Sequence, residues 1–228
     1  LGCTKGMPEI YGGSENADVG SDIVLTLTSG HYDKVFGGNN KGGRILGSIT
    51  VNIEQTGCLP ITIDELYLGS NNAPYSVFGY KDTYQEVLIN GETIRQYDLI
   101  DSADVKLFND PVLHLRSFES IGKVFGGGNG EHAIMVGDPT VEINVTKGWI
   151  NGQYIGTVQE YSQYNGTPQE LPQDGVIDTV FGGGNEAIVK GNTNILIGDS
   201  LSETITIKSM DQLYNRIPQE GQTRSHIK

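Results

Sequence analysis

One short motif recurs along this chain and constrains its fold more than any other feature. It consists of an aliphatic residue, an aromatic residue, two or three glycines and, in the clearest copies, an asparagine, as in the segment 124–129. The five copies begin at Ile10, Val35, Leu66, Val124 and Val180, and those at Ile10 and Leu66 are the weaker ones. A motif repeated at intervals of a few tens of residues indicates a chain built from stacked, similar units.

Short segments with alternating aliphatic residues accompany the motifs. They predict strands at 24–28, 50–53, 112–116, 141–145 and 194–197. Period-two alternation is typical of a strand with one buried face. A third short piece ending in glycine follows the motifs, as at 44–47, 134–137 and 188–191. We therefore predict an all-β chain folded as a right-handed parallel β-helix of about five coils, with three strands in each coil.

Two units are longer than the others. The excess predicts insert A at 74–108 and insert B at 149–178 within a single β-helix domain spanning 1–228. The chain does not begin with methionine, and its first motif starts almost at once. We therefore expect an excerpt of a longer repeat array, in contact with neighbouring repeats of its parent chain.

The register of the motifs predicts two columns that run from coil to coil. One is an aromatic column of Tyr11, Phe36, Tyr67, Phe125 and Phe181. The other concerns Asn39, Asn129 and Asn185, which follow the glycines. Two interpretations fit these asparagines: a stacked amide ladder, or turn residues that tolerate a positive φ. The same register separates Cys3 and Cys58 by two coil steps, too far for a disulfide, and predicts two free, mostly buried thiols.

Charge and hydropathy exclude two classes of partner. The formal net charge is -13, with 28 acidic and 15 basic residues, so binding to nucleic acid is not expected. No apolar run reaches the roughly 18 residues that a membrane-spanning helix needs, so no membrane span is expected.

The string Val-Phe-Gly-Gly-Gly-Asn, with the Gly-Asn-Thr-x-Ile-x-Ile pattern of 191–197, resembles a repeat in secreted and surface proteins of gut Bacteroidota. Those proteins are adhesin-like or largely uncharacterised. The resemblance covers most of residues 10–199 and leaves the inserts outside it. It implies a parallel β-helix in an extracytoplasmic location, at the cell surface or secreted. It implies no catalytic residue.

No catalytic or metal-binding constellation stands out from the sequence. The segment 128–133 matches Gly-x-Gly-x-x-Ala, but a strand rather than a helix is expected to follow it, so we interpret its glycines as structural. His114 and Arg116 are expected to face solvent, with Asn52 and Glu54 beside them in one adjacent coil and Glu142 and Asn144 in the other. No cluster of His, Asp and Glu has metal-ligand spacing. Catalytic residues, metal ions and cofactors are therefore not expected.

Function is predicted to reside in the two inserts, which hold many of the tyrosines and the only tryptophan. We expect a binding module that contacts a glycan or a protein through exposed aromatic side chains. The predicted contact residues are Tyr80, Tyr84, Trp149 and Tyr161. Both inserts are expected to meet as one patch, and the same aromatics can instead form a small core under the loops. The alternatives are a β-helix polysaccharide lyase or hydrolase, by analogy of fold alone, and a purely structural stalk segment.

Overall fold

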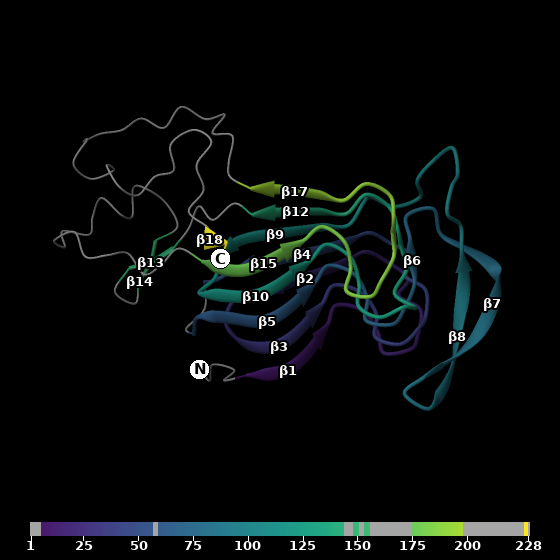
Figure 1. Ribbon diagram of the computed structural model, residues 1–228, viewed down its shortest axis with the longest axis horizontal. Coiled ribbons are helices and arrows are strands. Elements are labelled where there is room, and N and C mark those ends of the chain that lie inside the picture. The colour runs from purple at the N-terminus through teal and green to yellow at the C-terminus, as the bar shows by residue number, and fades with distance from the viewer. Residues whose placement is uncertain are drawn as a thin grey trace.

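The computed structural model describes residues 6–56, 59–143 and 175–197, and the backbone of three short strands at 148–150, 153–155 and 226–227. This described part is all-β, with strands and turns but no helix, and therefore no helix that could cross a membrane. Most strands belong to three parallel sheets, and two pairs of strands form antiparallel hairpins (Figure 1). Cys3 and Cys58 lie outside the described residues, so the thiol prediction stays a prediction.

The sheet that carries the repeated motifs is called here the motif sheet. Its strands, in spatial order, are β1 (Met7–Tyr11), β3 (Gly30–Phe36), β5 (Ile61–Tyr67), β10 (Ser120–Phe125), β15 (Val176–Phe181) and β18 (His226–Ile227).

The other two parallel sheets hold the segments on either side of each motif strand. The alternating sheet consists of β2 (Ile23–Leu27), β4 (Ile49–Glu54), β9 (Val112–Ser117), β12 (Thr140–Ile143) and β17 (Asn194–Ile197). The short sheet consists of β6 (Tyr75–Ser76), β11 (Met135–Val136) and β16 (Val189–Lys190).

The chain visits the three sheets in a fixed order. From β9 of the alternating sheet it passes to β10 of the motif sheet and β11 of the short sheet, and then to β12, which pairs in parallel with β9. The predicted unit of alternating strand, motif strand and short strand is therefore confirmed. The five predicted alternating strands are confirmed as well, and they lie side by side in parallel. Their inward residues Leu25, Val51, Leu113, Val141 and Ile195 form one register column.

Two separate groups of apolar side chains result from this register. Aliphatic residues of all three sheets form the main core, and the motif strands contribute pairs such as Tyr32 with Val35 and Ile63 with Leu66. The two residues of each pair are three positions apart, and the two residues between them both point away from the core. The aromatic column is confirmed as a second group outside the main core, with ring centroids between 4.7 and 5.0 Å apart.

The motif glycines are needed because the backbones of adjacent units approach closely. A Cβ atom built on Gly37 would lie 2.2 Å from the carbonyl oxygen of Leu68, and one on Gly126 would lie 2.3 Å from that of Gly182. Neither Gly37 nor Gly126 has a positive φ. These glycines therefore permit close packing between units rather than a special turn conformation.

An asparagine ladder lies directly after the glycines, as one of the two interpretations predicts. Asn185 donates to Asn129, Asn129 to Asn71, and Asn71 to Asn40, with N···O distances of 2.8, 2.8 and 2.9 Å. The prediction that Asn39 belongs to this row is wrong, because Asn39 is fully buried beside it. Its side chain accepts from the Ser14 backbone and donates to the carbonyl of Gly42. None of these asparagines has a positive φ, so the turn interpretation does not apply.

Insert A contains one ordered hairpin, formed by β7 (Tyr80–Ile89) and β8 (Glu92–Leu99). Its first residues belong to the repeat instead, because Tyr75–Ser76 pairs with β11 of the short sheet. Within insert B, the structure describes only the backbone of the hairpin between β13 (Gly148–Ile150) and β14 (Gln153–Ile155). The described hairpins of the two inserts lie at opposite ends of the molecule (Figure 1), so these parts of the inserts do not form the expected single patch. Insert A begins after a strand of the short sheet, and insert B begins after a strand of the alternating sheet. The two inserts therefore leave the repeat units at different corners.

Candidate functional site

The hairpin β7–β8 is the largest described element outside the parallel sheets, and its turn follows directly from the sequence. Ile89 pairs with Glu92, so Asn90 and Gly91 form a two-residue turn. Their φ angles are 50° and 83°, and such turns favour Asn-Gly because both residues need a positive φ. This dipeptide is the local signal for the hairpin in the sequence, and it was not used in predicting insert A.

One face of the hairpin is fixed on the repeat units. Ile94 is buried, and its side chain lies where a Cβ atom on Gly42 would stand. The amide of Gln96 donates to the carbonyl oxygen of Lys41 at 3.0 Å and also to that of Asn72. The hairpin is therefore attached to the glycine-asparagine turns through both packing and hydrogen bonds.

The opposite face of the hairpin carries two tyrosines in contact with each other. Tyr84 pairs with Tyr97 across the strands, and their rings meet edge to face at 6.0 Å. The guanidinium of Arg95 lies 4.2 Å from the centre of the Tyr84 ring, and that of Arg44 lies 4.4 Å from the centre of the Tyr97 ring. These cation–π contacts hold both rings in place at the surface.

A cavity of about 360 Å³ opens beside the Tyr97 ring. Asn16, Asp18 and Gly43 of the repeat units line one side. Glu86, Thr93, Arg95 and Tyr97 of the hairpin line the other. Apart from the tyrosine ring, the lining side chains are polar or charged, so the cavity suits a hydroxyl-rich ligand better than an apolar one.

Asp18 and Arg44 form a fixed ion pair at the edge of this cavity. Both Nε and Nη2 of Arg44 donate to Asp18 Oδ2, at 2.9 and 2.6 Å, and the Arg44 backbone N–H donates to Oδ1 at 2.7 Å. The Arg44 hydrogen bonds hold the pKa of Asp18 below its ordinary value. Asp18 is therefore an acceptor and an anion at neutral pH, not a proton donor.

The four predicted contact residues have different outcomes. Tyr84 is exposed, with 46% of its surface accessible, as expected. The expectation that Tyr80 is exposed is wrong, because its hydroxyl is directed into the structure. The hydroxyl accepts a hydrogen bond from the backbone N–H of Ile45 and donates one to the carbonyl of Pro74. Burial raises the pKa of Tyr80 well above its usual range, and we assign it as an anchor of the hairpin. Nothing is described for Tyr161 or for the side chain of Trp149, so their assignments stay predictions.

Other aromatics of insert A are packed inside, but they join the main core and do not form the separate small core of the second interpretation. Tyr75 is 1% exposed, and its hydroxyl donates to the carbonyl of Gly47 at 3.1 Å. Phe78 packs against the main core. Insert A thus divides its aromatic residues between anchoring and exposure. Tyr97 and Arg95 were not among the predicted contact residues, because only the strand pairing brings them beside Tyr84.

His114 occupies the surface position predicted for it on the alternating sheet. It pairs with Asn52 on one side and with Glu142 on the other, and its Nδ1 lies 2.7 Å from Glu142 Oε2. A register shift after Ile53 places Glu54 opposite Ser117, so Glu54 is not opposite Arg116 as expected. The interpretation of His114 as part of a cross-strand polar row is confirmed.

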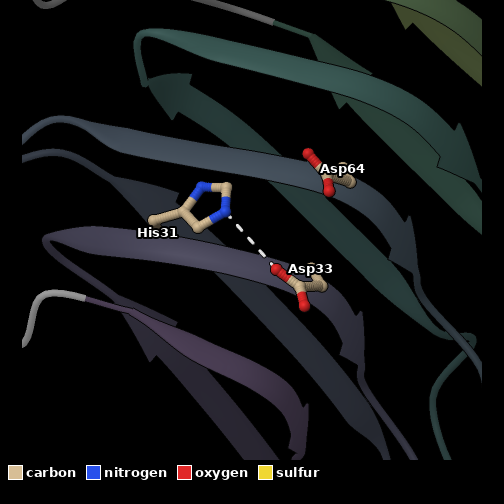
Figure 2. A group of neighbouring side chains, drawn as sticks. All are labelled: His31, Asp33 and Asp64. Atoms are coloured by element: carbon tan, nitrogen blue, oxygen red, sulfur yellow. Dashed lines mark ion pairs between the residues drawn. The ribbon is translucent and has the colours of Figure 1, made fainter.

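A second group of polar side chains lies on the motif sheet. Ligand-type atoms of His31, Asp33 and Asp64 all lie within 4.8 Å of one another (Figure 2). All three residues are exposed. The sequence reasoning found no such cluster because Asp64 is remote in the chain and reaches Asp33 only through the pairing of β3 with β5.

Comparison of the chain with protein-family models, with curated proteins and with solved structures finds no match in any of the three.

Proposed function

We propose that this chain is a right-handed parallel β-helix of about five coils that acts as a binding module. Its contact surface is the exposed face of hairpin β7–β8 together with the adjoining cavity. The coil assignment is supported by the fixed order in which the chain visits three parallel sheets. The handedness is supported by the strong preference of parallel crossover connections for the right-handed form.

The ligand that fits this surface best is a glycan. The observation that carries the proposal is the polar cavity with a tyrosine in its wall and a second exposed tyrosine beside it. Sugars present hydroxyl groups along their edges and C–H groups on their faces. The edges match Asn16, Asp18 and Thr93, and the faces match the tyrosine rings.

Catalysis of glycan cleavage is less well supported than binding. A hydrolase needs one carboxyl group that keeps its proton near neutral pH and a second carboxylate at a suitable distance. The cavity contains Asp18 and Glu86, but Arg44 shifts the pKa of Asp18 in the opposite direction to that of a general acid. A purely structural stalk segment would need neither the cavity nor an ordered hairpin with exposed tyrosines.

An extracytoplasmic location, at the cell surface or secreted, belongs to the same proposal. It is supported by the resemblance of the Val-Phe-Gly-Gly-Gly-Asn repeat to repeats in surface proteins of gut Bacteroidota. A glycan-binding module would meet its ligands there.

The experiment is a glycan array probed with the full chain, followed by titration of the best glycan. Tyr97→Ala and Tyr84→Ala each remove one ring of the surface, and we expect each to weaken binding by about tenfold or more, as for a ligand-contacting aromatic residue. A shortened chain tests the whole surface, with residues 81–98 replaced by Asn-Gly. The pair of Tyr80 with Leu99 then remains, as does the buried Tyr80 hydroxyl.

Phe181→Ala is the matched control, because Phe181 exposes 45% of its surface and belongs to the motif sheet, away from the hairpin. It is expected to bind like the unmodified chain. Glycan binding that survives in the folded, shortened chain would place the function on the repeats and overturn the proposal. Binding to proteins alone would support the protein-contact alternative instead.

A further inference from the structure

The group His31, Asp33 and Asp64 is produced by the register of two neighbouring motif strands. His31 pairs with Thr62, and Tyr32 and Lys34 pair with Ile63 and Glu65. Asp33 is therefore directly opposite Asp64. Residues two apart on a strand point to the same side of the sheet. His31, Thr62, Asp33 and Asp64 therefore form a square of polar side chains on one exposed surface.

Thr62 orients the imidazole of His31 within this square. The Nδ1 atom of His31 lies 2.6 Å from the hydroxyl oxygen of Thr62, and the Nε2 atom lies 3.4 Å from Asp33 Oδ1. The second nitrogen is therefore directed at the carboxylates (Figure 2). Metal-binding histidines are commonly held in this way, with one nitrogen hydrogen-bonded and the other free for the ion.

Among the described residues, Asp33 and Asp64 lack the lysine partners that Glu65, at the next position of the sheet, has. Glu65, one residue beyond Asp64, lies 3.4 Å from Nζ of Lys34 and 3.2 Å from Nζ of Lys123. Within the described part of the chain, no lysine or arginine forms an ion pair with Asp33 or Asp64. Like charges directly opposite on neighbouring strands destabilise a sheet, so this position is suited to an added cation.

We propose that His31, Asp33 and Asp64 bind a divalent first-row transition-metal ion of the zinc class, with water completing its coordination. An imidazole nitrogen favours such ions over calcium or magnesium, which prefer oxygen ligands alone. Ligand atoms at about 2.0–2.2 Å from a tetrahedral zinc ion are about 3.3–3.6 Å apart. Ligand atoms that lie within 4.8 Å of one another therefore need side-chain shifts of up to about 1 Å, which the rotation of exposed side chains supplies.

Such an ion would join β3 to β5 and neutralise the facing carboxylates. Because the ligands are placed in the folded sheet and not in the unfolded chain, binding stabilises the fold in proportion to the occupancy of the site. This site is independent of the proposed glycan surface, which lies on the hairpin.

The test is calorimetric titration of the full chain with zinc chloride after both cysteine thiols have been alkylated. We expect one equivalent of zinc to bind and to raise the midpoint of thermal unfolding. His31→Gln and Asp64→Asn should each weaken binding by at least about tenfold, because removal of even a supporting residue costs that much. His114→Gln is the matched control, since His114 contacts a single carboxylate, Glu142, and should leave the affinity unchanged.

A second measurement locates the ion independently of the cysteines. Manganese chloride added to the isotope-labelled chain should broaden the amide signals of β3 and β5 first, and Asp64→Asn should abolish that selectivity. Absence of zinc binding would overturn the proposal. So would equal affinity in all variants, or broadening centred elsewhere.

Discussion

The aromatic column makes a quantitative prediction about stability at Phe125. This ring is 5% exposed and is stacked between Tyr67 and Phe181, with centroids 4.7 and 5.0 Å away and interplanar angles of 5° and 13°. Replacement of a buried phenylalanine by alanine costs about 3–5 kcal/mol through lost burial and the cavity that remains. Each stacked pair contributes about 0.5–1.5 kcal/mol beyond burial. We therefore expect Phe125→Ala to lower the free energy of unfolding by about 3 kcal/mol or more, with the two lost stacked pairs adding to the cost of lost burial.

Phe125→Leu separates stacking from burial, because leucine keeps most of the apolar volume and loses both ring contacts. Its expected cost is about 1–3 kcal/mol, the sum of two stacked pairs. Phe181→Ala is the control for position in the column. Phe181 is 45% exposed and is stacked on one ring within the described residues, so about 1–2 kcal/mol is expected.

Urea unfolding followed by circular dichroism gives these values, provided that the denaturant dependence stays unchanged among the variants. A Phe125→Ala loss within ±0.5 kcal/mol would refute the reasoning, because it would mean that the column contributes nothing to the fold. Equal losses for Phe125→Ala and Phe181→Ala would also contradict it, since burial would then not determine the cost.

Two further predictions concern polar groups that join adjacent units. Lys106 and the backbone N–H of Asn192 donate to Asp138 at 2.8 and 2.7 Å and lower its pKa. A depressed carboxyl pKa stabilises the fold above the unfolded value of about 3.9, and this contribution is lost as the pH falls through the lower folded value. Asp138→Asn should therefore lower the free energy of unfolding by less than about 1 kcal/mol at pH 7. Below about pH 4, the free energy of unfolding of this variant should decline less than that of the unmodified chain. The same decline in both chains would contradict this. Asn39→Ala should cost about 2–3 kcal/mol in urea unfolding, because it leaves the partly buried N–H of Ser14 and the buried carbonyl of Gly42 without this side-chain partner. The exposed ladder residue Asn185 should tolerate alanine within about 1 kcal/mol.

The repeat made the parallel register predictable, because each motif places one residue of every column. Alternation of aliphatic residues then identified the strands on which Val51, Leu113 and Val141 stack. The error at Asn39 shows the limit of reading the motif by its glycines. Counted from the aliphatic residue at Val35, the ladder position is Asn40, five residues on, as Asn129 is from Val124. The copy at Val35 has one glycine fewer, and Asn39 fills the space of the third.

The candidate sites were less predictable because they depend on contacts outside the motif. The hairpin has its own local signal in Asn90-Gly91, but its attachment through Gln96 to the Lys41 carbonyl follows no repeat. Asp33 and Asp64 are different, since both lie two residues before the aliphatic residue of their motifs. Register counting would have placed them together, and only the orientation of His31 by Thr62 required coordinates.

The point at which the hairpin leaves the repeat explains how one chain can keep a uniform fold and a local site. The backbone N–H of Ile100 donates to the carbonyl of Gly79 at 3.1 Å, so the two ends of the hairpin meet. The backbone N–H of Leu107 then donates to the carbonyl of Val77, the residue after β6, at 2.8 Å, and the chain proceeds to β9. Because both ends close on the repeat, hairpin sequence can vary without altering the register of the sheets. Stability is therefore carried by residues that must match those of the neighbouring units, whereas the proposed recognition surface consists of residues free of that requirement.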